Sequence, residues 1–227
     1  MRDNVKIFVK CCSNVFAPPE PILEVGAFQV DGQIGYADLR TFFPGKRYIG
    51  VDVREGSGVD QVENVEQLSL SDGTVGSVII VDTLEHVENP HKALDEIHRV
   101  VRNDGMVIMA SPQNFPIHDY PRDFWRFTPE GFGFLLRGFP TKIIGAQGYL
   151  MNPHTVFGVG SKREIDEEMF DTFIVHLSRE LSKKSPTKAS MLNTFKGMIR
   201  PTYLEELSFD LHRNSICVKS IRARLRS

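Results

Sequence analysis

The chain has 227 residues, of which 41% are hydrophobic and 25% are charged, and its formal net charge is −2. This composition fits one globular domain, and the near-neutral charge excludes a globally basic nucleic-acid binder, so no nucleic-acid partner is expected. No apolar run approaches the length of a membrane span, and the N-terminus shows no cleavage site of a signal peptide. We therefore expect a cytoplasmic protein without membrane contact. The three cysteines, two of them adjacent, do not suggest a disulfide framework.

The first part of the chain predicts a helix and then a strand–helix–strand unit. The helix is expected over residues 4–15. Residues 21–25 form an apolar run that ends at Gly26, and a mixed segment with spaced apolar residues leads to a second strand over 48–51, closed by Asp52. In such a βαβ unit, the turn after the first strand and the acid after the second lie at the carboxyl edge of a parallel sheet. A carboxylate there is suited to the hydroxyls of a ribose.

The middle of the chain alternates strands with helices. The run SVIIV, which ends at Asp82, has β-branched residues at consecutive positions and predicts a strand buried on both faces. Together these elements predict an α/β, Rossmann-like, mostly parallel seven-stranded sheet with an antiparallel last strand and helices on both faces. The further strands are expected over 59–62, 77–81, 106–110, 141–149 and 154–159, and helices are expected to begin at Asn89-Pro90 and Thr128-Pro129.

The composition changes beyond residue 161. Apolar residues spaced by four predict an amphipathic helix over 163–182, which is also a candidate surface for a homodimer. A linker and a weakly patterned tail follow, and the end of the tail is basic, which is typical of a solvated face. We therefore divide the chain into an N-terminal helical segment (1–20), a main domain (21–162) and a C-terminal helix and basic tail (163–227).

Four motifs in order resemble those of class I S-adenosylmethionine-dependent methyltransferases, and most closely the subgroup called methyltransferase type 11. They are LEVG at 23–26, GVD at 50–52, the buried strand that runs into DTLEHVENP at 82–90, and EIHRVVRNDGMVIMASP at 96–112. The resemblance covers roughly residues 21–162, and its specificity comes from the ordered series rather than from any one motif. It implies the fold expected above and S-adenosylmethionine as the cofactor.

The resemblance also implies which residues hold the cofactor. The first motif would lie beside the methionine part, Asp52 would bind the ribose hydroxyls, and the residues after the second, third and fourth strands would surround the adenine and the cofactor's other side. Two glycines that the family usually has at alternate positions are replaced by Phe28 and Val30. The predicted cofactor-binding residues are Glu24, Gly26, Ala27, Phe28, Asp52, Val53, Asn64, Val65, Asp82 and Thr83.

Transfer of a methyl group from a sulfonium needs mainly alignment, although a hydroxyl acceptor also benefits from a base. His86, just past the fourth strand, and His118, in the loop after the fifth, are the candidate catalytic residues, because both lie at the carboxyl edge. For His86, a role in ordering its loop has equal weight. The other histidines are scattered, so no metal site is expected. Around His118, a loop crowded with aromatic and charged residues resembles a lid, and its candidate acceptor-binding residues are Asp119, Tyr120, Arg122, Trp125 and Arg126.

Three functions remain open at this point. The first is an S-adenosylmethionine-dependent methyltransferase that acts on a small polar molecule by direct displacement. The second is a non-catalytic, methyltransferase-like binding subunit, for which the two replaced glycines are the only support. The third is an NAD-dependent oxidoreductase, since an acid after the second strand also suits NAD. Gly26 is not followed by the G-x-G-x-x-G spacing of a pyrophosphate turn, which weighs against the third.

Overall fold

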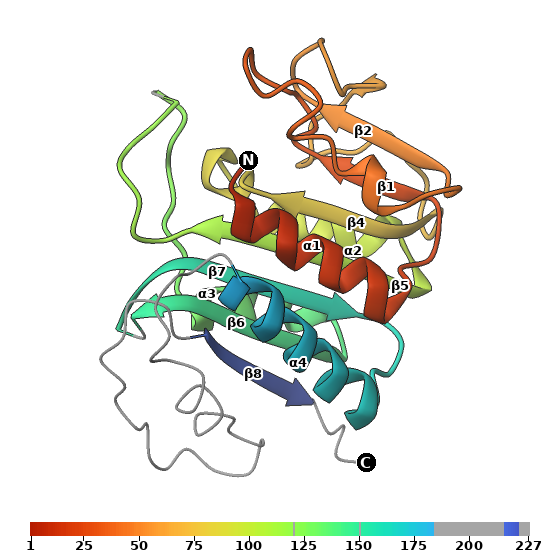
Figure 1. The fold of residues 1–227 in the computed structure, drawn as a ribbon. Helices are drawn as coiled ribbons and strands as arrows, with labels where there is room; N and C mark the ends of the chain where they lie inside the picture. The colour runs from red at the N-terminus through yellow and green to blue at the C-terminus, as the bar shows by residue number, and fades with distance from the viewer. Residues whose placement is uncertain (120, 150, 184–215, 223–227) are drawn as a thin grey trace.

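The computed structural model describes residues 1–119, 121–149, 151–183 and 216–222. Its centre is a sheet of eight strands in the order β3-β2-β1-β4-β5-β7-β6-β8 (Figure 1). The strands are β1 (Ile22–Val25), β2 (Tyr48–Asp52), β3 (Gln61–Val62), β4 (Val75–Val81), β5 (Val101–Pro112), β6 (Thr141–Tyr149), β7 (Asn152–Ser161) and β8 (Ile216–Arg222).

The pairing of the strands confirms the predicted sheet. Strands β1 to β5 are parallel to one another, whereas β7 runs antiparallel between β5 and β6. The predicted hairpin of β6 and β7 is therefore correct, and β7 is inserted beside β5 because the hairpin folds back onto the sheet. The eighth strand was not predicted. It pairs antiparallel with β6 at the sheet's edge, in a part of the chain where the sequence pattern is weak.

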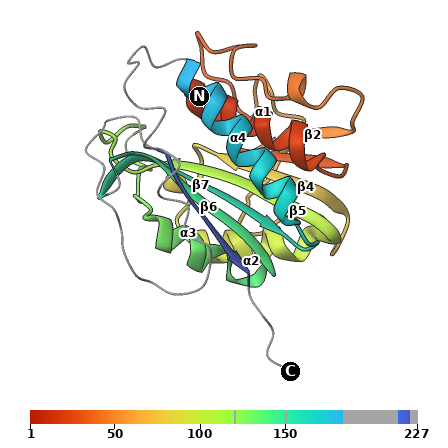
Figure 2. The same cartoon turned by 60° about the horizontal axis from the view of Figure 1, so that its bottom comes forward.

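Helices cover both faces of the sheet, as Figure 2 shows. α1 (Asp3–Phe16) and α4 (Glu167–Lys183) lie on one face, and α2 (Pro90–Val100) and α3 (Pro129–Leu135) lie on the other. Both helices of the second face begin as the sequence predicts, because Asn89 accepts a hydrogen bond from the Lys92 N–H and Thr128 accepts one from the Gly131 N–H. Short 3₁₀ helices complete the set at Arg40–Phe42 (η1), Leu84–His86 (η2) and Leu136–Gly138 (η3).

The helix predicted between the first two strands is wrong. Within residues 26–47 the structure contains only the single turn η1, and the rest is a loop. Gly26, Gly32 and Gly35 all have positive φ, which interrupts a right-handed helix, and the apolar side chain of Ile34 is 62% exposed. The face that this helix was expected to cover is covered instead by α1, which precedes β1 and belongs to the same core cluster as Leu39.

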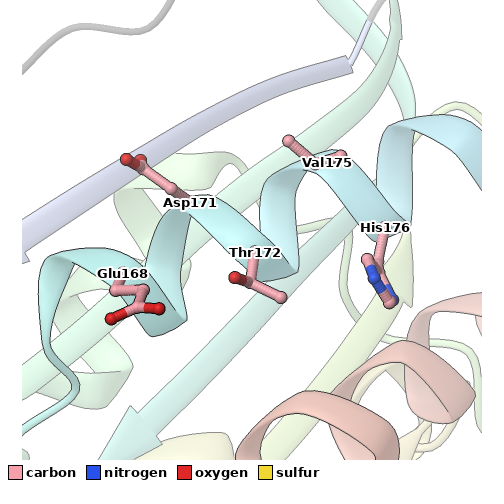
Figure 3. A pocket seen from close by; sticks show the side chains of 5 residues that line it. All are labelled: Glu168, Asp171, Thr172, Val175 and His176. Carbon is pink, nitrogen blue, oxygen red and sulfur yellow. The ribbon is translucent and has the colours of Figure 1, made fainter.

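The apolar side of α4 is buried within the chain. Phe173 packs against Phe8 and Phe16 of α1, with ring centroids 6.1 and 4.8 Å apart. The residues that suggested a dimer surface therefore belong to the protein's own core, and a dimer through this helix, which stays a prediction, has to use its outer face. That face bears a shallow hollow (Figure 3), lined by Glu168, Asp171, Thr172, Val175 and His176.

None of the helices in the described ranges is long and apolar enough to cross a membrane.

Candidate cofactor and active site

The candidate cofactor site lies where the order of the strands reverses. β1 and β4 are neighbours in the sheet. The strand that follows β1 in the chain, β2, lies on one side of this pair, and the strand that follows β4, β5, lies on the other. The carboxyl ends of β1 and β4 therefore frame a crevice, which is where open α/β sheets bind ligands. Gly26 follows β1 with φ +81°, and a Cβ atom there would lie 2.1 Å from the Oγ1 atom of Thr83, which follows β4. The structure thus brings two predicted cofactor-binding residues into direct contact, and only glycine fits at position 26.

Asp52 lies at the end of the adjacent strand and is 6% exposed. Its Oδ2 atom accepts a hydrogen bond from the Phe28 N–H at 3.3 Å, so the acid and the first loop are held together. Its Oδ1 atom accepts hydrogen bonds from the N–H and the Nε atom of Arg54, at 3.0 and 3.2 Å. The Arg54 guanidinium also lies over the Phe28 ring, 4.3 Å from its centroid. Sequence analysis missed Arg54, and nothing in the motif distinguishes it from an ordinary exposed arginine.

Glu24 is buried in the middle of β1, with 6% exposure. Its carboxylate accepts a hydrogen bond from the Tyr48 hydroxyl at 2.8 Å. Burial raises the pKa of Glu24 to about 7, although the Tyr48 hydrogen bond acts in the opposite direction. The side chain is therefore enclosed within the sheet and bound to Tyr48, and its predicted place beside the cofactor stays a prediction.

The residues predicted beside the adenine lie just beyond the ends of two adjacent strands, β2 and β3. Val53 is 54% exposed at the edge, whereas Val65 is 6% exposed and packs in the core. Asp52 pairs in register with Val62, so Asn64 lies just beyond the paired end of β3. The side-chain oxygen of Asn64 accepts a hydrogen bond from the Glu66 N–H at 2.9 Å and shapes the local turn. Of this group, Val53 presents the most apolar surface. Ala27, on the neighbouring loop, is buried.

Asp82 is held by an arginine from the other end of the sequence. It has φ +49°, and its two carboxylate oxygens lie 2.5 and 3.3 Å from the guanidinium of Arg2. The same guanidinium donates to the Thr155 hydroxyl on β7 at 2.5 Å. Arg2 therefore fixes the start of α1 over the carboxyl end of β4 and the amino end of the antiparallel strand β7, next to the predicted cofactor residues. Sequence analysis did not identify this contact, because the two residues are 80 positions apart.

The two candidate catalytic histidines lie side by side. The ring centroids of His86 and His118 are 4.8 Å apart, in an edge-to-face arrangement. The Nδ1 atom of His86 lies 2.6 Å from the Arg122 carbonyl, and that of His118 lies 3.2 Å from both the Pro116 carbonyl and an Asp123 carboxylate oxygen. Because these partners are acceptors, each Nδ1 carries the hydrogen, and each Nε2 is left as the basic nitrogen.

Glu85 completes this group, and sequence analysis missed it. Its side chain is fully buried, and one carboxylate oxygen accepts a hydrogen bond from the Ser111 hydroxyl at 3.0 Å. The other, Oε1, has no hydrogen-bond partner among the described residues and lies 4.0 Å from the Nε2 atom of His86. Burial raises the pKa of Glu85 to about 8, with the charge of Asp82 adding to the effect. In the sequence, the signal that could have identified Glu85 is the presence of an acid directly before His86 in an otherwise apolar turn.

Two contacts in this region bear on the predictions from the sequence. No metal site was expected, but Glu85, His86 and His118 place three potential metal ligands within 4.8 Å of one another. Arg126 is a predicted acceptor-binding residue, with pairing to an acid that fixes the loop as an equal alternative. Its guanidinium pairs with both oxygens of Asp123, at 2.5 and 2.8 Å, and holds the pKa of that acid far below its usual range. This contact favours the alternative, and a role of Arg126 toward the acceptor stays a prediction.

The remaining loop residues differ in what they offer a ligand. The Trp125 indole donates to the Val87 carbonyl at 2.9 Å, which holds the ring in place. The residue is 42% exposed, so part of the ring surface is accessible to a ligand. Arg122 is exposed, and in the part of the chain that the structure describes its guanidinium makes no ion pair. Asp119 is exposed at a positive φ of 50°. Tyr120 lies outside the described residues.

Comparisons with known proteins agree with this architecture. The family model described as "Methyltransferase domain" matches residues 36–109. No curated protein matches the chain. Among solved structures, it is similar to a 1,6-didemethyltoxoflavin-N1-methyltransferase from Burkholderia thailandensis with bound S-adenosylhomocysteine (TM-score 0.54, 16% identity, 71% of this chain and 79% of that one). It is also similar to a possible histamine N-methyltransferase from Thermotoga maritima (TM-score 0.51, 16% identity, 70% and 92%). A methyltransferase from Archaeoglobus fulgidus gives a TM-score of 0.51 at 15% identity, over 69% and 94% of the chains.

The fold is that of a class I S-adenosylmethionine-dependent methyltransferase. The family resemblance and fold class expected from the sequence are thereby confirmed, and the family match supports S-adenosylmethionine as the cofactor. In this methyltransferase fold, Gly26, Asp52 and Thr83 lie at the carboxyl edge of three neighbouring strands. The roles of individual site residues stay predictions.

Proposed function

We propose that this chain transfers a methyl group from S-adenosylmethionine to a small polar acceptor by direct displacement. The observation that carries the proposal is the buried Asp52 carboxylate, fastened to the Gly26–Phe28 loop at the reversal point of the sheet. The residues present fit the cofactor, because the glycine allows close approach of backbone and the carboxylate is suited to two ribose hydroxyls. Val53 offers exposed apolar surface for the adenine.

The cofactor supplies a methyl group that is already activated by the sulfonium charge, so the protein's task is to align the acceptor. We propose that the acceptor binds between η2 and the 113–127 loop, where His86 and His118 present their Nε2 atoms. Arg122 and the exposed part of Trp125 complete the recognition of a polar, anionic or aromatic acceptor. Either histidine can take the proton from an acceptor hydroxyl, whereas an amine acceptor needs no base.

One observation favours the alternative of a non-catalytic binding subunit. Arg54 occupies one oxygen of Asp52 and lies over Phe28, one of the positions where the family usually has glycine. If Arg54 holds this position permanently, the ribose loses a partner. No observation favours an NAD-dependent oxidoreductase. A homodimer through α4 and a cytoplasmic location also stay predictions.

The first experiment is calorimetric titration of the protein with S-adenosylmethionine, S-adenosylhomocysteine and NAD, each alone. We expect the first two to bind and NAD not to bind. Asp52→Ala should weaken binding at least tenfold, since hydrogen bonds to a charged group are worth about 1.5 to 3 kcal/mol each. Asp95→Ala, at an exposed acid on α2, is the matched control and should leave the affinity unchanged.

The companion variant Arg54→Ala separates the two functions. If the arginine only restrains Asp52, its removal should leave binding intact or strengthen it. Absence of binding by the wild type together with binding by Arg54→Ala would establish the non-catalytic alternative for the native chain. Binding of NAD in preference to S-adenosylhomocysteine would disprove the methyltransferase proposal.

A further inference from the structure

We propose that Glu85, His86 and His118 form a binding site for one divalent transition-metal ion, with Zn²⁺ as the best match. The site does not depend on the proposed methyl transfer, because its ligands come from η2 and the 113–127 loop rather than from the cofactor-binding residues. Its three potential ligand atoms lie within 4.8 Å of one another. Two histidines and one carboxylate from two separate segments thus converge on one point.

In each of the three side chains, the polar atom that would not bind the metal is held by another group of the protein. The Nδ1 atom of His86 donates to the Arg122 carbonyl, at 2.6 Å. The Nδ1 atom of His118 lies 3.2 Å from a carboxylate oxygen of Asp123, which Arg126 holds in place. Metal-binding histidines almost always donate their second nitrogen to a carbonyl or carboxylate in this way, since it fixes the tautomer and the orientation of the ring. The outer shell of a metal site is therefore already present.

The carboxylate gives a second and independent indication. One oxygen of Glu85 accepts from the Ser111 hydroxyl at 3.0 Å, whereas Oε1 is buried and has no partner among the described residues. A buried carboxylate oxygen without a hydrogen bond is costly. The neighbouring arginines do not meet this need, because Arg2 is paired with Asp82 and Arg126 with Asp123. A cation between Oε1 and the Nε2 atom of His86, which are 4.0 Å apart, satisfies both.

The donor set selects the kind of metal. Two imidazole nitrogens and one carboxylate oxygen are typical of Zn²⁺ sites with three protein ligands and one open position, whereas Mg²⁺ and Ca²⁺ prefer oxygen ligands throughout. Ligand atoms around a tetrahedral Zn²⁺ lie about 3.3 Å apart for bonds of about 2 Å. The observed spacing of up to 4.8 Å therefore has to contract by up to about 1.5 Å, and we expect His118, on a surface loop, to supply this movement. Its side chain is 34% exposed and that of His86 is 20% exposed, so the open position faces solvent.

An ion at this point changes how an acceptor is activated. A metal bound to both Nε2 atoms removes the two histidines as proton acceptors. A hydroxyl group that enters the open position instead has its pKa lowered by the metal charge. Metal binding would thus determine whether the acceptor loses its proton to a histidine or through contact with the metal. This effect would be independent of the affinity for the cofactor.

The test is titration of metal-free protein with Zn²⁺, followed by calorimetry, and with Co²⁺, followed by its visible absorption, in the absence of any cofactor or acceptor. We expect one Zn²⁺ per chain, a tetrahedral Co²⁺ spectrum, and no comparable binding of Mg²⁺. His118→Ala and Glu85→Gln should each weaken Zn²⁺ at least tenfold. His176→Ala, which removes an exposed histidine on the outer face of α4, is the matched control and should bind like the wild type.

The outcomes separate the proposal from its alternatives. Failure of the wild type to bind Zn²⁺ overturns it, and so does binding that both His118→Ala and Glu85→Gln retain. Thermal unfolding without metal shows whether the two variants fold, and His118→Ala tests the site even if the buried Glu85→Gln variant is destabilised. Because no cofactor is used, a protein that binds Zn²⁺ but not S-adenosylhomocysteine supports the metal site while the proposed methyl transfer fails.

Discussion

The backbone at Gly26 lies directly against the side chain of Thr83, which follows the neighbouring strand β4. Its φ is +81°, and a Cβ atom would lie 2.1 Å from Thr83 Oγ1. Gly26→Ala should therefore destabilise the protein by about 2 to 4 kcal/mol, the sum of the left-handed backbone and the contact. Gly73→Ala is the matched control, since Gly73 has φ +61° and no atom within 4 Å of the added Cβ, and it should cost only about 1 kcal/mol. The measurement is urea unfolding, and equal losses would show that Thr83 moves away freely.

The buried acid Glu24 makes stability depend on pH. Its pKa is raised from 4.5 to about 7, so between these values the folded state keeps a proton that the unfolded state loses. The free energy of unfolding therefore falls as pH rises through this window, by up to about 3 kcal/mol, and the loss is complete above pH 7. Glu24→Gln should remove this component while it keeps an acceptor for the Tyr48 hydroxyl.

The check for Glu24 is urea unfolding at pH 4.5 and pH 8. Relative to the wild type, Glu24→Gln should gain stability at pH 8 compared with pH 4.5. Glu88→Gln, at an exposed position, controls for the loss of one carboxylate. A difference between Glu24→Gln and the wild type that stays constant across this range would show that the carboxylate is solvated in the folded state.

Single residues of the site were predictable where a motif marks them. Gly26, Asp52 and Thr83 were named because they stand in motifs that resemble those of the methyltransferases, and the structure brings them to one edge of the sheet. Arg2 and Arg54 were not identified, because an arginine that pairs with an acid across the fold looks like any surface arginine in the sequence. The proximity of His86 and His118 was also hidden, since it depends on the path of a long loop.

At the level of elements, the contact between α1 and α4 holds one face of the sheet together. Phe8 is 1% exposed, and its ring lies 4.6 Å from that of Phe157 and 6.1 Å from that of Phe173. Phe8→Ala should cost about 3 to 5 kcal/mol of stability in urea unfolding. Val175→Ala, at a site on α4 that is 50% exposed, should cost less than about 1 kcal/mol. The double variant of Phe8 and Phe173 should lose less than the sum of the single losses, and additivity would show that the two rings act separately.

The elements with strong periodicity or clear caps were predicted, and the others were not. α2 and α4 follow from a cap and from apolar spacing, and β4 follows from its β-branched run. The segment 26–47 has some spaced apolar residues but also four glycines at positive φ. No long helix forms there, and α1 covers that face of the sheet instead. β8 depends on pairing with β6 from 216–222, and a strand that forms at an edge needs little pattern of its own.

At the scale of the whole molecule, the thiols of Cys11 and Cys12 lie on the buried side of α1. Their reactivity therefore measures how readily α1 separates from the sheet. Cys11 is 3% exposed and Cys12 is fully buried, and burial raises the pKa of Cys11 to about 11 and that of Cys12 well above its ordinary value. In a Cys217→Ser background at pH 8, a thiol reagent should react with the native protein on the order of a hundredfold more slowly than with the unfolded chain. The rate should increase with urea in parallel with unfolding followed by circular dichroism. Fast labelling in native buffer would show that α1 detaches independently.

The packing of Phe8 on Phe157 and Phe173 also has a consequence for the order in which the protein is made. The first helix leaves the ribosome early, but its aromatic partners are encoded about 150 residues later. At roughly 5 to 20 residues per second, the apolar side of that helix waits about 7 to 30 s before its partners exist. For that interval the nascent chain carries an uncovered aromatic surface on this helix, so synthesis of the segment that contains Phe157 and Phe173, rather than formation of the central strands, allows this face of the sheet to close.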